Sequence, residues 1–336
     1  MSNLKNILIK KNSCKSIWFM RQAGRYLPEF RKIRSVEANF IQLCLDSKLS
    51  SEITLQPIKR FDLDSAIIFS DILMVPYALN QNVDFIKDYG PKLDDFNLNS
   101  FLENNEQTFT KKLSPVYKAI EITRKKLDKE KSLISFIGAP WTLLIYMLDL
   151  KKNKNQVDLD KLQNLKFSFN KIVEELIKYL CIHIKNQIES GADVVQIFDS
   201  WAGLIPYKNI KEYCYIPNAK IADYCKIKKI PHIFFPKGIK EKYEDFNKFV
   251  KPDGLNIDPD LNPLWAKNKL NNVVIQGGLD PRILLKSENE IYEGATKYIQ
   301  AFKDIPYVFN LGHGLLPETD PDKVDKLIKF YRNFNG

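Results

Sequence analysis

Short apolar runs alternate along the chain with longer segments in which apolar residues recur every three or four positions. Eight runs are short, rich in β-branched or aromatic residues and almost free of charge, which is typical of strands buried on both faces. These predicted strands are Ile17–Met20, Ala66–Phe69, Leu133–Ile137, Val194–Phe198, His232–Phe235, Gly254–Ile257, Val273–Gln276 and Tyr307–Phe309.

The segments between the predicted strands carry helix signals. A helix is predicted from Pro28 to Leu45, since proline is favoured in the first turn. Apolar residues from Leu162 to Ile188 form one helical stripe, and Gly191 is a natural C-terminal cap for it. Pro281 and Pro321 mark the starts of two later helices.

Eight strands separated mostly by helices predict an α/β fold, a single-domain (β/α)₈ TIM barrel over residues 1–336. A doubly wound sheet is the alternative. It usually has a Gly-rich phosphate loop after its first strand, and R-Q-A-G-R at Arg21–Arg25 is not such a loop. The connection over residues 76–130 is long, and Val83–Ile86 and Pro91–Leu93 are predicted to form a small hairpin excursion near residues 80–95.

Polar residues directly follow several predicted strands. Arg21 follows the first, Asp71 the second, Ser200 the fourth and His313 the last, while Tyr146 lies one to two turns beyond the third. The C-terminal ends of all barrel strands meet at one mouth, where the active site is built. The pattern therefore predicts one shared site.

Arginines dominate the first of these positions. Arg21 and Arg25 flank Gln22, Ala23 and Gly24. Because arginine stays charged and can bind a carboxylate through two hydrogen bonds, the pair suits a substrate with several carboxylates. An ordinary surface loop could have the same spacing, so both interpretations stay open at this point.

The other strand-end residues also have structural alternatives. Asp71 and Ser200 could each cap a following helix, and Tyr146 could be a core residue whose hydroxyl bonds to backbone. His313 lies between two glycines, which permit close backbone approach. The chain has two further histidines, both predicted to be structural: His183 in an apolar helix and His232 at a strand start.

The amino-acid composition limits the classes of molecule that the protein is expected to bind. The formal net charge is +10 and the pI about 9.1, which suits nucleic acid, an anionic membrane or an acidic substrate, or reflects a general bias towards lysine on solvated surfaces. Lysines are spread over the predicted polar helix faces without a dense basic block with interleaved aromatics, so no nucleic-acid partner is predicted. The longest apolar run, Ala139–Leu148, is too short to cross a membrane, so no membrane association is predicted.

Cysteine usage indicates the compartment. The five cysteines are scattered without C-x-x-C spacing, which favours reduced thiols in a cytoplasm. Residues 1–11 are Lys-rich but lack the apolar core of a signal peptide. A soluble cytoplasmic protein is expected. The chain contains no P-loop, G-x-S-x-G or H-E-x-x-H motif and nothing that suggests a zinc or iron site.

Several ordered motifs resemble the uroporphyrinogen decarboxylase family over nearly the whole length. The two family signatures are matched by W-F-M-R-Q-A-G-R-Y-L-P-E-F-R at Trp18–Arg31 and F-I-G-A-P-W-T-L at Phe136–Leu143. Further matches lie at Ile67–Leu73, Gln196–Gly203 and Asn310–Gly314. Gly278 is a departure, because relatives usually have asparagine there.

The resemblance implies a single-domain (β/α)₈ barrel and a homodimer with facing clefts, with no metal or organic cofactor. The implied reaction removes carbon dioxide from the four acetate side chains of uroporphyrinogen III, giving coproporphyrinogen III for haem and chlorophyll biosynthesis. Residue by residue, the resemblance assigns carboxylate binding to Arg21 and Arg25 and pyrrole N–H binding to Asp71. It further assigns the substrate loop to Gln22, Ala23 and Gly24, polar contacts to Tyr146, Ser200 and His313, and an apolar floor to Ile67 and Phe69.

The chemistry agrees with these assignments. Loss of carbon dioxide needs an electron sink, and a protonated pyrrole ring can serve as one without a cofactor. Ionised Asp71 would then stabilise the developing positive charge, while Arg21 anchors the reacting acetate and assists proton delivery. The very high pKa of arginine makes it an unusual acid, so His313, Tyr146 or a bound water are rival proton donors.

Two other functions remain as alternatives. A methyltransferase of the same superfamily would bind zinc through H-x-C and a later cysteine, but His232-Ile233-Phe234 lacks that cysteine and none follows Cys225. A basic nucleic-acid-binding or scaffold protein would retain DNA or RNA in a salt-sensitive way and show no turnover.

Overall fold

Eight parallel strands form the centre of the structure. The computed structural model describes residues 2–11, 16–37, 39–86, 90–153, 156–163 and 168–334. All eight predicted strands are present, although the first two end earlier than expected. They are β1 (Ser16–Ile17), β2 (Ser65–Ile67), β5 (Ser132–Gly138), β8 (Val194–Asp199), β9 (His232–Pro236), β10 (Gly254–Ile257), β11 (Val274–Gly277) and β12 (Tyr307–Phe309).

The strands follow one another around a nearly closed barrel. Their order is β1-β12-β11-β10-β9-β8-β5-β2, and the neighbouring strands pair in parallel. Asp64, just before β2, accepts the Ile17 N–H at its Oδ2 (2.7 Å) and donates its own N–H to the Ile17 carbonyl (2.9 Å). These bonds join the two ends of the sheet, which confirms the predicted barrel and excludes an open doubly wound sheet.

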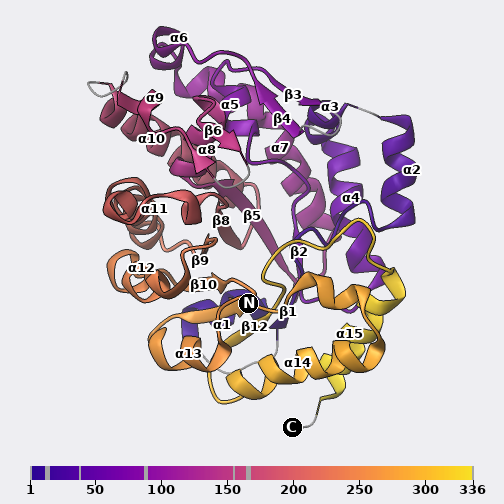
Figure 1. Ribbon diagram of the computed structural model, residues 1–336. Helices are drawn as coiled ribbons and strands as arrows, with labels where there is room; N and C mark the ends of the chain where they lie inside the picture. The colour runs from indigo at the N-terminus through magenta and orange to yellow at the C-terminus, as the bar shows by residue number, and fades with distance from the viewer. Residues whose placement is uncertain are drawn as a thin grey trace.

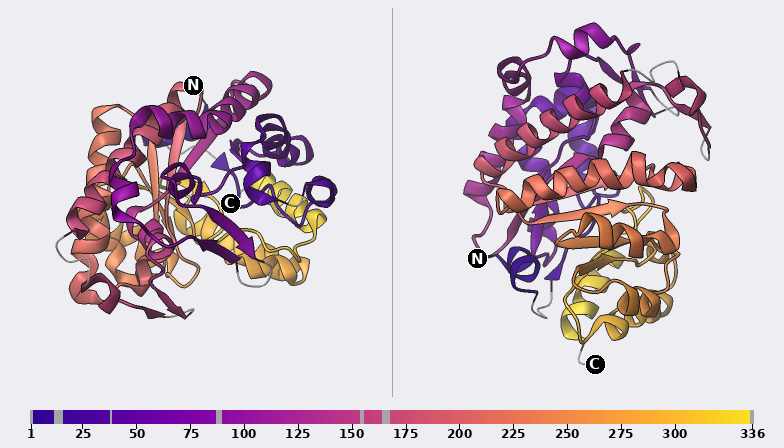
Figure 2. Two further views of the ribbon diagram at one scale, coloured as in Figure 1. Left: turned by 90° about the horizontal axis from the view of Figure 1, so that it is seen from above. Right: turned by 90° about the vertical axis from the view of Figure 1, so that its left-hand side faces the viewer.

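Helices cover the outside of the barrel (Figures 1 and 2). Within the described residues, no helix is long and apolar enough to cross a membrane. The helices are α1 (Asn3–Lys10), α2 (Pro28–Val36), α3 (Phe40–Leu45), α4 (Ser47–Arg60), α5 (Met74–Ala78), α6 (Leu98–Leu102), α7 (Glu106–Lys126), α8 (Pro140–Met147), α9 (Asp160–Gln163), α10 (Phe169–Glu189), α11 (Ile216–Ile227), α12 (Tyr243–Val250), α13 (Pro263–Lys269), α14 (Glu288–Phe302) and α15 (Pro321–Asn333).

The prediction of one helix from Pro28 to Leu45 is wrong. The first helix, α2, ends at Val36, and Glu37 is extended at φ −107°. Asn39 then caps α3 by accepting the Gln42 N–H at its side chain (3.0 Å). A strong N-cap of this kind starts a new helix, and apolar periodicity alone does not register it.

Two later helix predictions also change in detail. The apolar stripe of Leu162–Ile188 is divided between α9 and α10, and residues 164–167 between them lie outside the described residues. Gly191 does follow the end of α10, with φ +113°. The segment that begins at Pro281 is a short 3₁₀ helix, Pro281–Leu285, which α14 follows.

Two small antiparallel pairs stand apart from the barrel sheet. Strands β3 (Val83–Ile86) and β4 (Gly90–Leu93) pair where the sequence predicts the hairpin excursion. A second pair, β6 (Lys151–Asn153) and β7 (Gln156–Val157), was not predicted. Its residues are mostly exposed, so no apolar alternation marks them in the sequence.

The barrel interior is closed at its N-terminal end by α1. Leu4, Ile7 and Leu8 of this helix are fully buried in the same apolar cluster as Trp18 and other inward-facing strand residues. Above them lies a polar layer, in which the Gln276 side chain accepts the Trp18 indole N–H (3.0 Å). The N-terminal end is thus filled by packing, which leaves the opposite end for a site.

Candidate active site

The loop after β1 places Arg21 at the C-terminal end of the barrel. Gln22 is buried and braces this loop, because its Oε1 accepts the Phe19 N–H (3.1 Å) and its Nε2 donates to the Ser65 carbonyl (3.0 Å). Arg21 itself has φ +58°, a left-handed conformation that is costly for arginine. The loop therefore holds Arg21 in a fixed and strained position, typical of a functional residue.

The loop after β12 lies directly against Arg21. The Leu315 N–H donates to the Met20 carbonyl (2.9 Å), and Asn310 Oδ1 accepts the Met20 N–H (3.1 Å). A Cβ added to Gly314 would lie 2.3 Å from Cδ of Arg21. A side chain at this position would displace that of Arg21, which explains one of the two glycines that flank His313.

The Arg21 side chain is exposed to solvent but only partly solvated. Its side chain is exposed, yet surrounding protein lowers its pKa by loss of solvation. Asp71 partly offsets this effect, and the neighbouring charge of Arg25 adds to it. Arg25 is exposed as well. The Arg21 side chain is thus accessible to a ligand, while the surrounding protein reduces its solvation.

Asp71 is half-buried beyond the end of β2. Loss of solvation raises its pKa to about 6, against the opposing effects of the Leu73 N–H and of Arg21. The Leu73 N–H donates to Asp71 Oδ1 (2.8 Å). Asp71 therefore binds a backbone N–H in the turn before α5, which is part of the capping role that the sequence also allowed. Within the described residues Oδ2 has no hydrogen-bond donor, which leaves it available to a ligand.

Tyr146 and Ser200 come from neighbouring parts of the barrel. Tyr146 is half-buried on α8, with its ring edge-on to Trp201 at 6.1 Å between centroids. Burial raises the pKa of Tyr146, the nearby Trp201 side chain opposes this, Asp71 raises the pKa further and Arg21 lowers it. Ser200 is exposed and caps no helix, because the next helical turn, Ala202–Leu204, has Trp201 at its N-cap.

His313 is half-buried beside the same cations. The pKa of His313 is lowered to about 4, chiefly by burial and also by the charges of Lys237 and Arg21. The imidazole is therefore neutral at pH 7. His183 is buried and bonded to the Tyr117 hydroxyl (3.0 Å), and buried His232 lies 3.0 Å from the Ile230 carbonyl, as expected of structural histidines.

The remaining predicted residues take different places. Ile67 belongs to the apolar cluster inside the barrel. Phe69 packs on Phe30 and Phe40, both at 5.7 Å between ring centroids, so it contacts the layer of α2 and α3. Ala23 and Gly24 are half-buried in the Arg21 loop.

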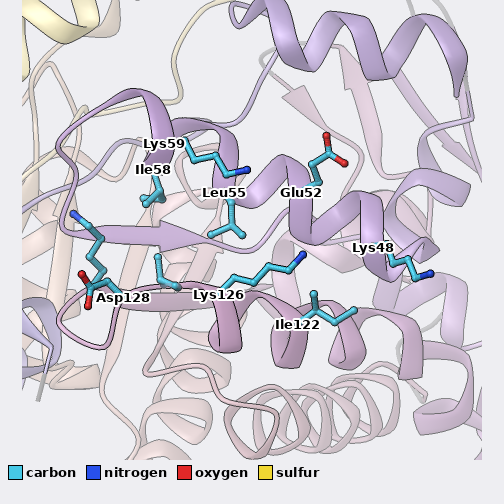
Figure 3. A pocket seen from close by; sticks show the side chains of 10 residues that line it. Lys48, Glu52, Leu55, Ile58, Lys59, Ile122, Lys126 and Asp128 are labelled. Atoms are coloured by element: carbon cyan, nitrogen blue, oxygen red, sulfur yellow. The ribbon is translucent and has the colours of Figure 1, made fainter.

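A surface groove of about 760 Å³ lies elsewhere, between α4 and α7 (Figure 3). Lys48, Glu52 and Lys59 of α4 line it together with Ile122 and Lys126 of α7. Among the described residues, none of the polar strand-end side chains takes part. The groove is in the outer helix layer, whereas Arg21 interacts electrostatically with Asp71, Tyr146 and His313 at the end of the barrel.

Comparison with known protein families decides between the decarboxylase resemblance and the methyltransferase and nucleic-acid-binding alternatives. The family model described as uroporphyrinogen decarboxylase (URO-D) matches residues 8–334. The chain belongs to the uroporphyrinogen decarboxylase family. A uroporphyrinogen decarboxylase from Orientia tsutsugamushi (strain Ikeda) is 43% identical over 332 residues, covering 95% of this chain and 94% of the relative. One from Rickettsia bellii (strain RML369-C) is 42% identical over 326 residues, with the same coverage.

Solved structures share the fold at low identity. A methyltransferase from Methanosarcina mazei superposes with a TM-score of 0.79 at 14% identity, covering 99% of this chain and 98% of that chain. A putative vitamin-B12-independent methionine synthase from Listeria monocytogenes superposes with a TM-score of 0.54, also at 14% identity, covering 97% and 98% of the two chains. These likenesses concern the fold alone. In the part of the chain that the structure describes, no three His, Cys, Asp or Glu side chains gather as metal ligands would.

Sequence reasoning passed over three polar residues at this end of the barrel, and the strand-end pattern contains a signal for two of them. Lys237 follows β9, and Asp258 follows β10. Thr142, inside the second signature, donates its hydroxyl to the buried Asp199 (2.8 Å) and accepts the Trp201 N–H (3.2 Å). Applying the strand-end rule to β9 and β10 as well would have found the first two.

Proposed function

We propose that the chain decarboxylates the four acetate side chains of uroporphyrinogen III, giving coproporphyrinogen III. One observation carries the proposal within the family assignment. Asp71, Tyr146 and His313 follow three different strands, and each interacts electrostatically with Arg21 of a fourth. The substrate presents carboxylates and pyrrole N–H groups. Arg21 is a cation that can bind the carboxylates, and Asp71 is a carboxylate that can accept the N–H bonds.

The reaction needs positive charge to develop on a pyrrole ring. Protonation of a ring carbon gives a cation, and the electrons of the breaking carbon–carboxylate bond then flow into that ring. We propose that ionised Asp71 accepts pyrrole N–H bonds and stabilises the cation, a preorganised electrostatic role. With a pKa of about 6, most Asp71 side chains are ionised at pH 7.

Arg21 is proposed to anchor the reacting acetate. Of the rival proton donors, His313 is neutral at pH 7 and carries no imidazolium proton to give, since its pKa is about 4. Tyr146 keeps its phenolic proton, because burial raises its pKa. A raised pKa also makes the Tyr146 phenol a weaker acid, so these directions count against His313 and leave Tyr146 or a water beside Arg21 as the proposed donor.

We also propose a homodimer in the cytoplasm. Tyr207 and Leu264, which follow β8 and β10, are 70% and 59% exposed, and large apolar side chains at that end suit an interface around the site. The free thiols of Cys44, Cys181, Cys214 and Cys225 suit a reducing compartment. Analytical ultracentrifugation of the purified protein tests the dimer, and a purely monomeric species would contradict it.

The decisive experiment is anaerobic incubation with uroporphyrinogen III, followed by oxidation and chromatography of the products. We expect a ladder of porphyrins from eight carboxylates to four. Unchanged substrate in the presence of folded protein would overturn the proposal. Retention of DNA or RNA without turnover would instead favour the nucleic-acid alternative.

A further inference from the structure

Lys237 has a backbone that is fixed on both sides. Its N–H donates to the Asp199 carbonyl (3.1 Å), and its carbonyl accepts the Gly203 N–H (2.9 Å). The next N–H, of Gly238, donates to Asp258 Oδ2 (2.6 Å). The last residue of β8, the loop after β8 and the residue after β10 thus hold the residue that follows β9, so the Lys237 side chain starts from a defined point.

The loops around Lys237 also touch directly. A Cβ on Gly203 would lie 2.7 Å from the Gly238 carbonyl oxygen, and Gly238 itself has φ +83°. Two glycines are needed for this approach, since any side chain on Gly203 would push the Lys237 loop away. The two glycines therefore fix the position of this loop at the C-terminal end of the barrel.

The Lys237 ammonium is half-buried without a matching partner. Loss of solvation lowers its pKa, Arg21 lowers it too, and Asp258 only partly compensates. Asp258 already accepts the Gly238 N–H and the Tyr243 hydroxyl (2.9 Å). Among the described residues, no carboxylate forms an ion pair with Lys237. An unpaired, poorly solvated cation costs stability, so an anion brought by a ligand would be a natural partner.

The strand order places this cation across the barrel from the arginines. In the order β1-β12-β11-β10-β9-β8-β5-β2, β9 is four strands from β1 in either direction. Arg21 follows β1 and Lys237 follows β9, yet the charges of both act on His313. The two cations thus follow strands on opposite sides of the barrel, at the same end of it.

We propose that Lys237 is a further carboxylate-binding residue of the site, which takes a carboxylate on the side of the tetrapyrrole opposite to the one held by Arg21. The inference rests on the proposed function. A macrocycle with its centre over Asp71 carries carboxylates around its whole periphery, so cations on one wall alone would leave the far side unbound. Charge-assisted bonds from Lys237 would fix the rotation of the ring in its plane.

The test compares Lys237→Met and Lys237→Arg with the wild type in the anaerobic assay. Lys240→Met, an exposed lysine three residues along the same loop, is the matched control. We expect Lys237→Met to raise KM roughly 10- to 100-fold, the usual worth of a hydrogen bond to a charged group, with a smaller change in kcat. Lys237→Arg keeps the charge and should restore most of the affinity, and the control should match the wild type.

Two further measurements separate binding from a structural role. The melting temperature of Lys237→Met should equal or exceed that of the wild type, because a poorly solvated cation is removed. By NMR, the pKa of His313 should rise in Lys237→Met, since one of the cations that lower it is gone. A melting temperature that falls while KM is unchanged, or an unmoved His313 pKa, would overturn the proposal.

The assay also separates this inference from the function on which it rests. Folded wild-type protein without turnover overturns both. Active wild-type protein together with an unchanged KM in Lys237→Met overturns only the role of Lys237.

Discussion

Asp71 shows how one side chain can serve local structure and chemistry together. Its Oδ1 accepts the Leu73 N–H, and its poor solvation raises the pKa to about 6. An ionised carboxylate under these conditions destabilises the native state above that pH. The fold holds it there nonetheless, as expected where a function needs the charge.

We predict that Asp71→Asn lowers kcat for uroporphyrinogen III by roughly 10²- to 10³-fold, because the preorganised charge is lost. Asparagine retains an oxygen for the Leu73 N–H, so the turn is preserved. The melting temperature above pH 7 should be unchanged or higher, since the penalty of the ionised carboxylate is removed. A variant that keeps most of the turnover while folding normally would rule out charge stabilisation.

The pH dependence of activity should report the same group. Asp71 is ionised above its pKa of about 6 and neutral below it. We therefore expect kcat/KM to fall as the pH decreases through about 6, because kcat/KM follows the free enzyme. A pH–rate profile of wild type and Asp71→Asn measures this, and an inflection that persists in the variant would assign the titration to another group.

Gly314 is the residue that leaves room for Arg21. A Cβ there would lie 2.3 Å from Cδ of Arg21, so Gly314→Ala must displace the guanidinium. Small misplacements at a reacting group can lower rates on the order of 10²-fold, and we predict a loss of kcat/KM of that order. Gly294→Ala in α14, where the nearest atom is 3.3 Å away, is the control and should retain activity. Equal activities of the two variants would contradict the contact with Arg21.

At the scale of elements, α1 is the clearest case of a structure that motif reading passes over. Its eight residues close the barrel floor through Leu4, Ile7 and Leu8, although the segment reads as a Lys-rich terminus. The same helix offers a matched pair, because Ile7 is fully buried and Ile9 is 51% exposed.

We predict that Ile7→Ala lowers the free energy of unfolding by about 2–5 kcal/mol, as for other large-to-small core changes. Ile9→Ala should change it by about 0.5 kcal/mol or less, as is usual for exposed positions. Denaturant unfolding of both variants measures the difference. Equal destabilisation would mean that α1 does not seal the barrel in solution.

For the whole molecule, the net charge of +10 can act on an anionic substrate before contact. Salt shortens the reach of this attraction, to about 3 Å at 1 M. We predict that kcat/KM for uroporphyrinogen III falls as ionic strength rises, and that it falls less for intermediates with fewer carboxylates. Steady-state assays over a series of salt concentrations test this. Identical salt dependence of kcat/KM for uroporphyrinogen III and for the intermediates would exclude steering by the substrate's charge.

The sequence by itself determined the barrel, because eight charge-free runs in alternation with helices have few other ways to bury their apolar surface. It also placed Arg21, Asp71, Tyr146 and His313 at one end, since each follows a strand or its helix. Local capping was harder to read, and Asn39 divided a helix that periodicity predicted to be continuous.

Only the tertiary structure decided the solvation, the backbone conformation and the long-range contacts of these residues. The raised pKa of Asp71, the strained backbone of Arg21 and the contact between Arg21 and Gly314 depend on segments far apart in the chain. The same holds for Lys237, which faces Arg21 only because closure of the sheet sets β9 opposite β1. Solvation and charge act through space, so the order of residues alone does not specify them.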